Sequence, residues 1–303
     1  MNNDAYLNIP MNEIDDILIK QIEVALIEDI GPGDITTLAT IGPGTAKAAI
    51  VAKSEGVLAG LPIVESVFSK LDADIEIFNI KKDGQPFVPG ETIAEYKGQT
   101  SAILTGERTA LNYLGHLSGI ATLVSEFVHR IKGTGAVILD TRKTTPGLRY
   151  LEKYAVTCGG GQNHRYGLYD MVLIKDNHIA ACGTIREAVE KTRMYLNDKS
   201  FVERFGEGWS NILIEVEVES EEQLREAVDC GVTRLLLDNR SPEQLATMVK
   251  LARSLSDDLK LEASGNVRFD NVRKIAETGV DYISIGALTH SAPSSDFSLN
   301  IVK

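Results

Sequence analysis

Hydrophobic positions follow two different patterns along the chain, and the change falls near residue 135. Over 101–132 apolar residues recur three and four positions apart, the spacing of one long amphipathic helix that Gly133 ends. A shorter helix is expected over 14–28, and turn-rich segments around short apolar runs fill 31–96. The first half is therefore predicted to be a small α+β domain, which the long helix links to the second half.

The second half alternates apolar runs with helical segments. Two of these segments, SEEQLREAVDCG and SPEQLATMVKLARSL, open with a serine at an N-cap position and have a glutamine three residues later. Strands that alternate with helices predict a parallel sheet, either a closed barrel or an open doubly wound sheet. The expected strands lie at 136–140, 171–176, 212–218, 234–238, 261–264 and 282–286.

Polar residues at the carboxyl ends of these strands favour the barrel. In an α/β barrel those ends converge on one mouth, where such enzymes carry out their chemistry. The residues concerned are Arg142, Lys143, Lys175, Glu217, Asp238, Ser264, Gly286 and His290.

Charge and composition narrow the function classes. The chain has 303 residues with 31 Lys and Arg against 43 Asp and Glu, and its net charge of -12 argues against nonspecific binding to nucleic acid or membranes. The sequence has no long apolar run and begins with polar and acidic residues, so we expect no membrane span, no signal peptide and a cytoplasmic location. Cys158, Cys182 and Cys230 lack the spacing of zinc or redox sites and are expected to be buried thiols.

One segment carries a net positive charge in an otherwise acidic chain. Residues 140–165 include five Lys and Arg against one Asp and one Glu. Arginine grips a carboxylate through two parallel hydrogen bonds and lysine adds a point charge, so the segment is typical of a site for a small, multiply charged acid. Three consecutive glycines at 159–161 favour this over a solvated loop, because they suit a sharp bend or close approach to a ligand.

Further candidates lie at the expected strand ends. Lys175 ends the apolar run VLIK, where an unpaired ammonium is costly to bury, so we expect an anion beside it. His164, and with weaker reason His178, could hydrogen-bond in a site or be ordinary loop histidines; neither has metal-ligand spacing.

Two carboxylates in IEVEVES alternate with valines. Glu215 and Glu217 therefore point to one face of the sheet, where inward carboxylates must meet a cation or a hydroxyl donor. Glu217 and Asp238, on neighbouring strands, suit Mg²⁺ or the two hydroxyls of a ribose, with capping of the following helices as the alternative.

Small residues follow the last two expected strands. The segments EASGNV at 262–267 and SIGALTHSA at 284–292 could offer free backbone N–H groups to a phosphate, although tight turns also need glycine. Basic side chains for an acid, backbone amides for a phosphate and carboxylates for a sugar or metal together predict phosphoribosyl transfer to a small acid.

The motifs resemble those of quinolinate phosphoribosyltransferases. The resemblance runs in order over about 25–298 and implies an N-terminal open-faced α+β sandwich over 1–132. It also implies an incomplete, TIM-like α/β barrel over 133–290 and a C-terminal tail over 291–303 that packs back on the N-terminal domain. The motifs are GDITT, GERTALN, TRKTTPGLR, GGGQNHRYGLYD, LIKDNH, EVEVES, LLLDN, EASGN and GVDYISIGALTHS.

The resemblance also implies an activity and an assembly. The enzyme would transfer a phosphoribosyl group from phosphoribosyl pyrophosphate to quinolinate with Mg²⁺, then lose CO₂ to give nicotinate mononucleotide for NAD synthesis. It would be a homodimer in which Arg108 enters the neighbouring chain's site. Catalytic roles would fall to Lys143, Lys175, Glu217 and Asp238, of which Glu217 and Asp238 would hold Mg²⁺, directly or through water. Substrate-binding residues would be Arg108, Thr141, Arg142, Lys143, His164, Arg165, Lys175, Glu217, Asp238, Ser264, Gly265, Asn266, Ser284, Gly286, Ala287 and His290.

Two departures from the family pattern leave rival functions open. Family members often carry arginine where this chain has Thr157, and residues 194–211 resemble a surface insertion. A related protein linked to molybdenum transport remains an alternative. Nicotinate phosphoribosyltransferase is disfavoured because a monoacid needs fewer cations, and a noncatalytic sensor because Glu217 and Asp238 would hinder pure anion binding.

Overall fold

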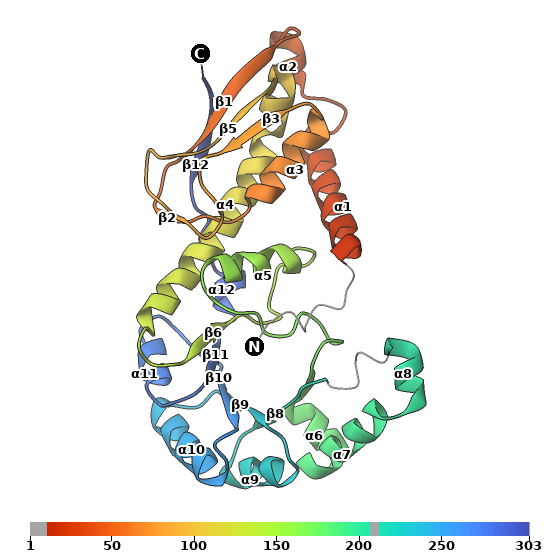
Figure 1. The fold of residues 1–303 in the computed structure, drawn as a ribbon, viewed down its shortest axis with the longest axis vertical. Helices are drawn as coiled ribbons and strands as arrows, with labels where there is room; N and C mark the ends of the chain where they lie inside the picture. The colour runs from red at the N-terminus through yellow and green to blue at the C-terminus, as the bar shows by residue number, and fades with distance from the viewer. Residues whose placement is uncertain (1–10, 207–211, 303) are drawn as a thin grey trace. The chain divides into compact units, whose positions relative to one another are not determined.

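The structure is a computed structural model that describes residues 11–206 and 212–302. These residues form two compact units (Figure 1). Unit 1 contains the described residues of Met1–Glu126, Lys143–Gly161 and Ala287–Lys303, and unit 2 contains those of Phe127–Arg142 and Gln162–Gly286.

Unit 1 is built on an antiparallel sheet in the order β12-β1-β5-β3. Aromatic pairs anchor its core, with the ring centroids of Phe68 and Tyr96 4.8 Å apart and those of Phe87 and Phe297 5.0 Å apart. The strands are β1 (Thr45–Ala52), β2 (Gly56–Val57), β3 (Glu76–Asn79), β4 (Pro86–Phe87), β5 (Thr92–Gln99) and β12 (Phe297–Val302). The helices are α1 (Met11–Ile30), α2 (Ile35–Thr40), α3 (Leu61–Leu71), α4 (Thr100–Arg130), α5 (Arg149–Cys158) and α12 (Ala287–His290). The end of α4, from Phe127 onward, belongs to unit 2.

The division into units differs from the predicted domain ranges. The tail strand β12 pairs antiparallel with β1, but the segment 143–161, expected in the barrel domain, belongs to unit 1. The reason is packing of this segment on α4. A Cβ added at Gly159 would lie 2.4 Å from the Ala121 carbonyl oxygen, so only glycine permits this approach.

The same packing explains the glycine triplet. A Cβ at Gly161 would lie 2.9 Å from side-chain atoms of both Val124 and Val156, and Gly160 has a φ of 88°. The expected sharp bend is present, while the close approach is to α4 within unit 1.

Unit 2 contains a parallel sheet in the order β6-β11-β10-β9-β8-β7. Its ends, β6 and β7, share no ladder in the described part of the chain, so the α/β barrel is incomplete. The strands are β6 (Val137–Leu139), β7 (Val172–Ile174), β8 (Ile214–Val218), β9 (Arg234–Asp238), β10 (Lys260–Ser264) and β11 (Tyr282–Ser284).

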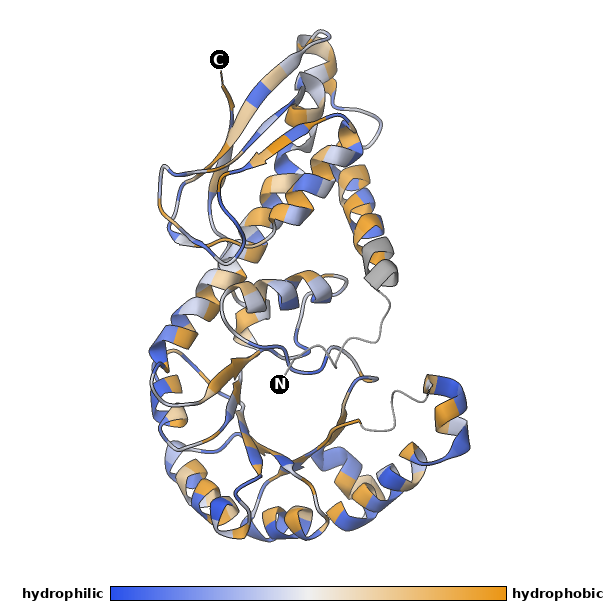
Figure 2. Cartoon of the chain, viewed as in Figure 1, coloured by the Kyte–Doolittle hydropathy of each residue, from blue (hydrophilic) through white to orange (hydrophobic). Residues whose placement is uncertain are grey.

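Helices lie outside the curved sheet of unit 2 (Figure 1). In Figure 2 the strands of unit 2 are mostly orange with some blue positions, and the helices show mixed colours, which fits largely buried strands beneath amphipathic helices. The serine N-caps are confirmed: Ser220 and Ser241 accept hydrogen bonds from the backbone N–H groups of Gln223 and Gln244. The helices are α6 (Asp176–Cys182), α7 (Ile185–Leu196), α8 (Lys199–Phe205), α9 (Glu221–Asp229), α10 (Pro242–Leu255) and α11 (Val272–Ala276).

Three expectations concern features away from the site. Of the three free cysteines Cys230 is buried, but Cys158 and Cys182 are half-buried, so the expectation of buried thiols was wrong for two of them. Among the helices of 11–206 and 212–302, none is long and apolar enough to cross a membrane. Within the expected insertion, α8 packs through Phe201, while 207–211 lie outside the described residues.

Candidate active site

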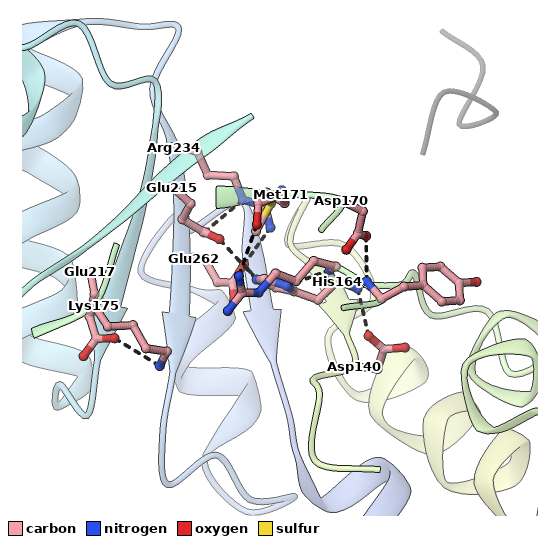
Figure 3. A network of polar contacts seen from close by, with 11 residues as sticks. Asp140, His164, Asp170, Met171, Lys175, Glu215, Glu217, Arg234 and Glu262 are labelled. Atoms are coloured by element: carbon pink, nitrogen blue, oxygen red, sulfur yellow. Dashed lines mark hydrogen bonds and ion pairs between the residues drawn. The ribbon is translucent and has the colours of Figure 1, made fainter. Parts of the chain in front are cut away.

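Four charged side chains form a buried cluster inside unit 2 (Figure 3). Strand register places Arg234 opposite Glu215, and Arg234 Nε donates to Glu215 Oε1 at 2.9 Å. The same guanidinium donates through Nη2 to Glu262 Oε2 at 2.7 Å and lies over the Tyr282 ring. His164 Nε2 lies 3.2 Å from Glu215 Oε2 and 3.4 Å from Glu262 Oε2. One arginine thus holds two carboxylates in contact with one imidazole.

Two carboxylates govern the charge of His164. Burial lowers the pKa of this ring, but Glu262 and Glu215 outweigh burial and raise the pKa to about 9. The Arg165 amide N–H donates to Nδ1 at 2.7 Å, and this hydrogen bond opposes protonation of that nitrogen. The two contacts with carboxylates favour the protonated ring more strongly than one amide hydrogen bond opposes it, so we assign a cationic ring. The proton on Nδ1 then replaces the hydrogen bond from the Arg165 amide. The four charges of the cluster then cancel.

A metal ion does not fit this cluster. Ligand atoms of His164, Glu215 and Glu262 lie within 4.8 Å of one another, which is close enough to bind an ion. Both carboxylates, however, already pair with Arg234, whose guanidinium provides the positive charge that an ion would provide.

A second set of charged side chains lies at the carboxyl ends of β7, β8 and β9. Lys175 Nζ pairs with Glu217 Oε2 at 3.3 Å, which confirms the anion expected beside this lysine (Figure 3). Burial raises the pKa of Glu217, Lys175 lowers it, and Asp238 and Asp176 raise it further. Glu217 and Asp238 are therefore close enough for their negative charges to interact.

Two arginines lie close together in unit 2. Burial lowers the pKa of Arg165, and the charge of Arg142 lowers it further. Arg165 Nη1 donates to the Met171 carbonyl oxygen at 3.1 Å, which orients the guanidinium. Like charges held together in a half-buried place favour an anion between them.

Buried aspartates shape the loop that carries Arg165. The His164 N–H donates to Asp140 Oδ1 at 2.8 Å, so the end of β6 fixes the start of this loop. Asp170 accepts from the backbone N–H groups of Tyr166 and Gly167 at 2.7 and 2.8 Å (Figure 3). Carboxylates hydrogen-bonded in this way make a rigid turn, so His164 and Arg165 are positioned by their own loop.

The loops after β9 and β10 contact each other. Ser264 ends β10, and its carbonyl oxygen accepts from the Asn239 N–H at 2.8 Å. Asn266 Nδ2 donates to Asn239 Oδ1 at 3.0 Å. Gly265 has a φ of 85°, and both asparagines are also left-handed.

Other expected site residues fall into two groups. In unit 2, Thr141 and Gly286 are half-buried at strand ends, and Ser284 is buried beside Glu262. Burial raises the pKa of Glu262, but His164, Arg234 and a hydrogen bond to Ser284 together lower it. His178 accepts from the Lys175 N–H at 2.9 Å and so closes the first turn of α6. In unit 1, Arg108, Lys143 and His290 are exposed, Ala287 begins α12, and Thr157 donates to a carbonyl of its own helix.

Sequence reasoning missed Arg234, Glu262 and Asn239. Arg234 and Glu262 are charged residues in apolar strands, the same signal that singled out Lys175. Asn239 directly follows a strand-end aspartate, where a left-handed asparagine makes a tight turn. Their contacts depend on register between strands, which the spacing of one segment does not give.

Comparison with known proteins places this geometry in a family. Residues 34–118 match the model of the quinolinate phosphoribosyl transferase N-terminal domain, and residues 120–300 match that of its C-terminal domain. The chain belongs to the quinolinate phosphoribosyl transferase family. Both domains of the family are therefore present, in the order that the sequence motifs predicted.

Individual relatives cover almost the whole chain. A probable nicotinate-nucleotide pyrophosphorylase (carboxylating) of Bacillus subtilis is 45% identical over 94% of this chain and 93% of its own length. One from Synechocystis is 42% identical over 92% and 90%. The solved nicotinate-nucleotide pyrophosphorylase of Francisella tularensis superposes with a TM-score of 0.88 at 38% identity and covers 99% of this chain and 100% of its own. The quinolinate phosphoribosyl transferase fold thus extends over both units.

Proposed function

We propose that this enzyme transfers a phosphoribosyl group from phosphoribosyl pyrophosphate to quinolinate and releases CO₂, giving nicotinate mononucleotide for NAD synthesis. Membership of the quinolinate phosphoribosyl transferase family supports this activity. The observation in the structure that carries it is the neighbouring pair Arg142 and Arg165, because two cations side by side match the adjacent carboxylates of a pyridine dicarboxylate.

The transfer needs positioning rather than a covalent nucleophile. The pyridine nitrogen forms the bond to ribose C1 as the bond from C1 to the pyrophosphate oxygen breaks, and the electron pair leaves with pyrophosphate. Arg142 and Arg165 orient the acid, while Lys175 stabilises negative charge. The ring nitrogens of His164 already contact Glu215, Glu262 and the Arg165 amide, so His164 acts by holding Arg165 in place. The role of Lys143 stays a prediction. The quaternised ring nitrogen then stabilises the electron pair left on C2 when CO₂ departs, and a proton from solvent replaces the carboxylate.

The carboxylates and the glycine-containing loops bind the ribose 5-phosphate part of the substrate. Glu217 and Asp238 accept hydrogen bonds from the ribose hydroxyls. The half-buried or exposed residues that end or follow β10 and β11, including Ser264, Gly265, Asn266 and Gly286, bind the 5-phosphate. Phosphate-binding roles for Ala287 and His290 stay predictions. Thr141 contributes a hydroxyl at the end of β6.

Glu217 and Asp238 are suitable ligands for Mg²⁺, because they are neighbouring carboxylates and Mg²⁺ prefers oxygen ligands. They also lie beside the proposed position of the pyrophosphate. When bound, the ion would neutralise charge on the leaving pyrophosphate. Lys175, already paired with Glu217, orients that carboxylate.

The proposal includes a homodimer in which Arg108 of the partner subunit completes each site. The supporting observation is that Arg108 is exposed on α4. An Arg108→Ala chain mixed with a Lys175→Ala chain tests this, since each homodimer should be nearly inactive. Random mixing makes about half the dimers mixed, with one intact site each, so roughly a quarter of wild-type activity should return. No recovery despite proven subunit exchange would contradict the shared site.

The activity itself is tested with quinolinate, phosphoribosyl pyrophosphate and Mg²⁺, measuring nicotinate mononucleotide, pyrophosphate and CO₂ together. Equal amounts of the three products are expected. Tight binding of phosphoribosyl compounds with no product would instead favour the noncatalytic sensor, and turnover of a different acid would favour the relative linked to molybdenum transport. The cytoplasmic location expected from the sequence stays a prediction.

A further inference from the structure

Asn239 connects two parts of the proposed site. It directly follows Asp238 at the end of β9, and its side chain reaches the loop after β10. Asn239 Nδ2 donates to Asp238 Oδ2 at 2.5 Å, and Asn239 Oδ1 accepts from Asn266 Nδ2 at 3.0 Å. A single amide group therefore contacts both the proposed ribose carboxylate and the proposed phosphate loop.

The chemistry of the partners fixes the orientation of this amide. An ionised carboxylate can only accept, so the NH₂ group of Asn239 must face Asp238. The oxygen of Asn239 is then left to accept from the NH₂ group of Asn266. An aspartate of the same shape would place a carboxylate against Asp238 and could not make both contacts.

The backbone supports the same arrangement at some cost. Asn239 and Asn266 have φ values of 53° and 52°, a left-handed conformation that is uncommon outside glycine. Gly265 begins the loop after β10, and a Cβ there would be 2.2 Å from Asn239 Oδ1. Strained backbone that the surroundings hold in place is a feature of functional sites.

The Asn266 side of the contact is itself fixed. Asn271 Nδ2 donates to the Asn266 carbonyl oxygen at 3.0 Å, and Asn271 Oδ1 accepts from the Arg268 N–H at 2.8 Å. The loop after β10 is therefore held at two points, by Asn271 from the start of α11 and by Asn239 from the end of β9.

We propose that Asn239 is a positioning residue that sets the ribose carboxylate Asp238 and the phosphate loop at Gly265 and Asn266 in one fixed relation. The inference rests on the proposed function, because it takes these groups as the ribose and 5-phosphate contacts. It predicts that the ribosyl phosphate, rather than the acid, is the substrate sensitive to Asn239.

The alternative is that Asn239 only makes a left-handed turn. Glycine adopts that conformation without cost, so a turn residue would tolerate Asn239→Gly. A positioning residue would not, because the substitution keeps the backbone and removes both amide contacts. Asn239→Asp is the complementary variant, because it keeps the size of the side chain and removes its NH₂ donor.

The experiment compares wild type, Asn239→Gly and Asn239→Asp with the matched control Asn197→Gly. Asn197 is exposed at the end of α7, where its amide donates to the Arg193 carbonyl of the same helix. Binding of ribose 5-phosphate is measured by calorimetry, and KM and kcat are measured for both substrates. Thermal melting of each variant separates loss of positioning from loss of fold.

We expect Asn239→Gly to melt close to wild type, to bind ribose 5-phosphate about tenfold more weakly and to raise KM for phosphoribosyl pyrophosphate similarly. KM for quinolinate should stay unchanged. Asn239→Asp should lose more, because two carboxylates then repel, and Asn197→Gly should match wild type.

Unchanged ribose 5-phosphate affinity in Asn239→Gly would overturn the proposal, as would an equal rise in KM for both substrates. Wild-type protein that binds no ribose 5-phosphate would overturn it too. Wild-type protein that binds ribose 5-phosphate but makes no nicotinate mononucleotide would overturn the proposed function alone, and weaker binding by Asn239→Gly would then still support the positioning role.

Discussion

Replacing Arg234 by glutamine should expose how much the buried cluster depends on one guanidinium. In the wild type Arg234 and His164 balance Glu215 and Glu262, and the guanidinium touches both carboxylates at 2.9 and 2.7 Å. The two glutamate side chains are at most 1% exposed, so water cannot replace the lost cation. The substitution therefore leaves one uncompensated buried negative charge.

Removing one partner of a buried ion pair typically costs about 3–5 kcal/mol, and we expect Arg234→Gln to lose stability in that range. The assay is urea unfolding followed by circular dichroism at pH 7. Glu262→Gln added to Arg234→Gln restores charge balance among Glu215 and His164, so the double variant should be more stable than Arg234→Gln alone. Arg234→Lys keeps the charge without the fork that reaches both carboxylates and should fall between wild type and Arg234→Gln.

This reasoning would be refuted if Arg234→Gln unfolded at the same urea concentration as the wild type. It would be refuted equally if the double variant lost the sum of the two single effects, because independent sites add and a charge-balanced cluster does not.

Two further predictions concern the titrating and the sugar-binding groups. His164 has a pKa of about 9 in the folded protein against about 6.5 in the unfolded chain. Its contribution to the free energy of unfolding is therefore fully present below pH 6.5 and is lost as the pH rises through 9. Nitrogen NMR should show an imidazolium ring at pH 7, and a neutral ring with its proton on Nε2 would contradict this assignment. Glu217→Ala and Asp238→Ala should each lower turnover by roughly a hundredfold while the melting temperature changes little, since their removal relieves repulsion between neighbouring carboxylates. Large losses of stability in both variants would indicate a structural role instead.

Local patterns predicted the elements of unit 2 well. Alternation of apolar runs with serine-capped helices gave the parallel strands, and period two placed Glu215 and Glu217 on one face, where both meet cations. The need of Lys175 for an anion followed from its place in an apolar strand. These inferences depend on neighbours within one segment or on desolvation alone, so the sequence carries them.

Contacts between segments were harder to predict. The partner of Glu215 is set by strand register, which places Arg234 opposite it. On the next strand Arg234 is in register with Lys260, and its long side chain reaches Glu262 two residues further along. Ser284 is buried and hydrogen-bonds Glu262, a contact that the sequence did not indicate; that it binds substrate stays a prediction. The glycines at 159–161 fit packing on α4, which residue spacing cannot distinguish from a ligand loop.

The central claim is that the site is built for a diacid. Steady-state rates with quinolinate and with nicotinate, each with phosphoribosyl pyrophosphate and Mg²⁺, test it most directly. Nicotinate lacks the second carboxylate, so it would leave the neighbouring guanidinium groups of Arg142 and Arg165 desolvated and incompletely paired. We predict that kcat/KM for quinolinate exceeds that for nicotinate by about 10³-fold or more. Comparable values for the two acids would contradict the account.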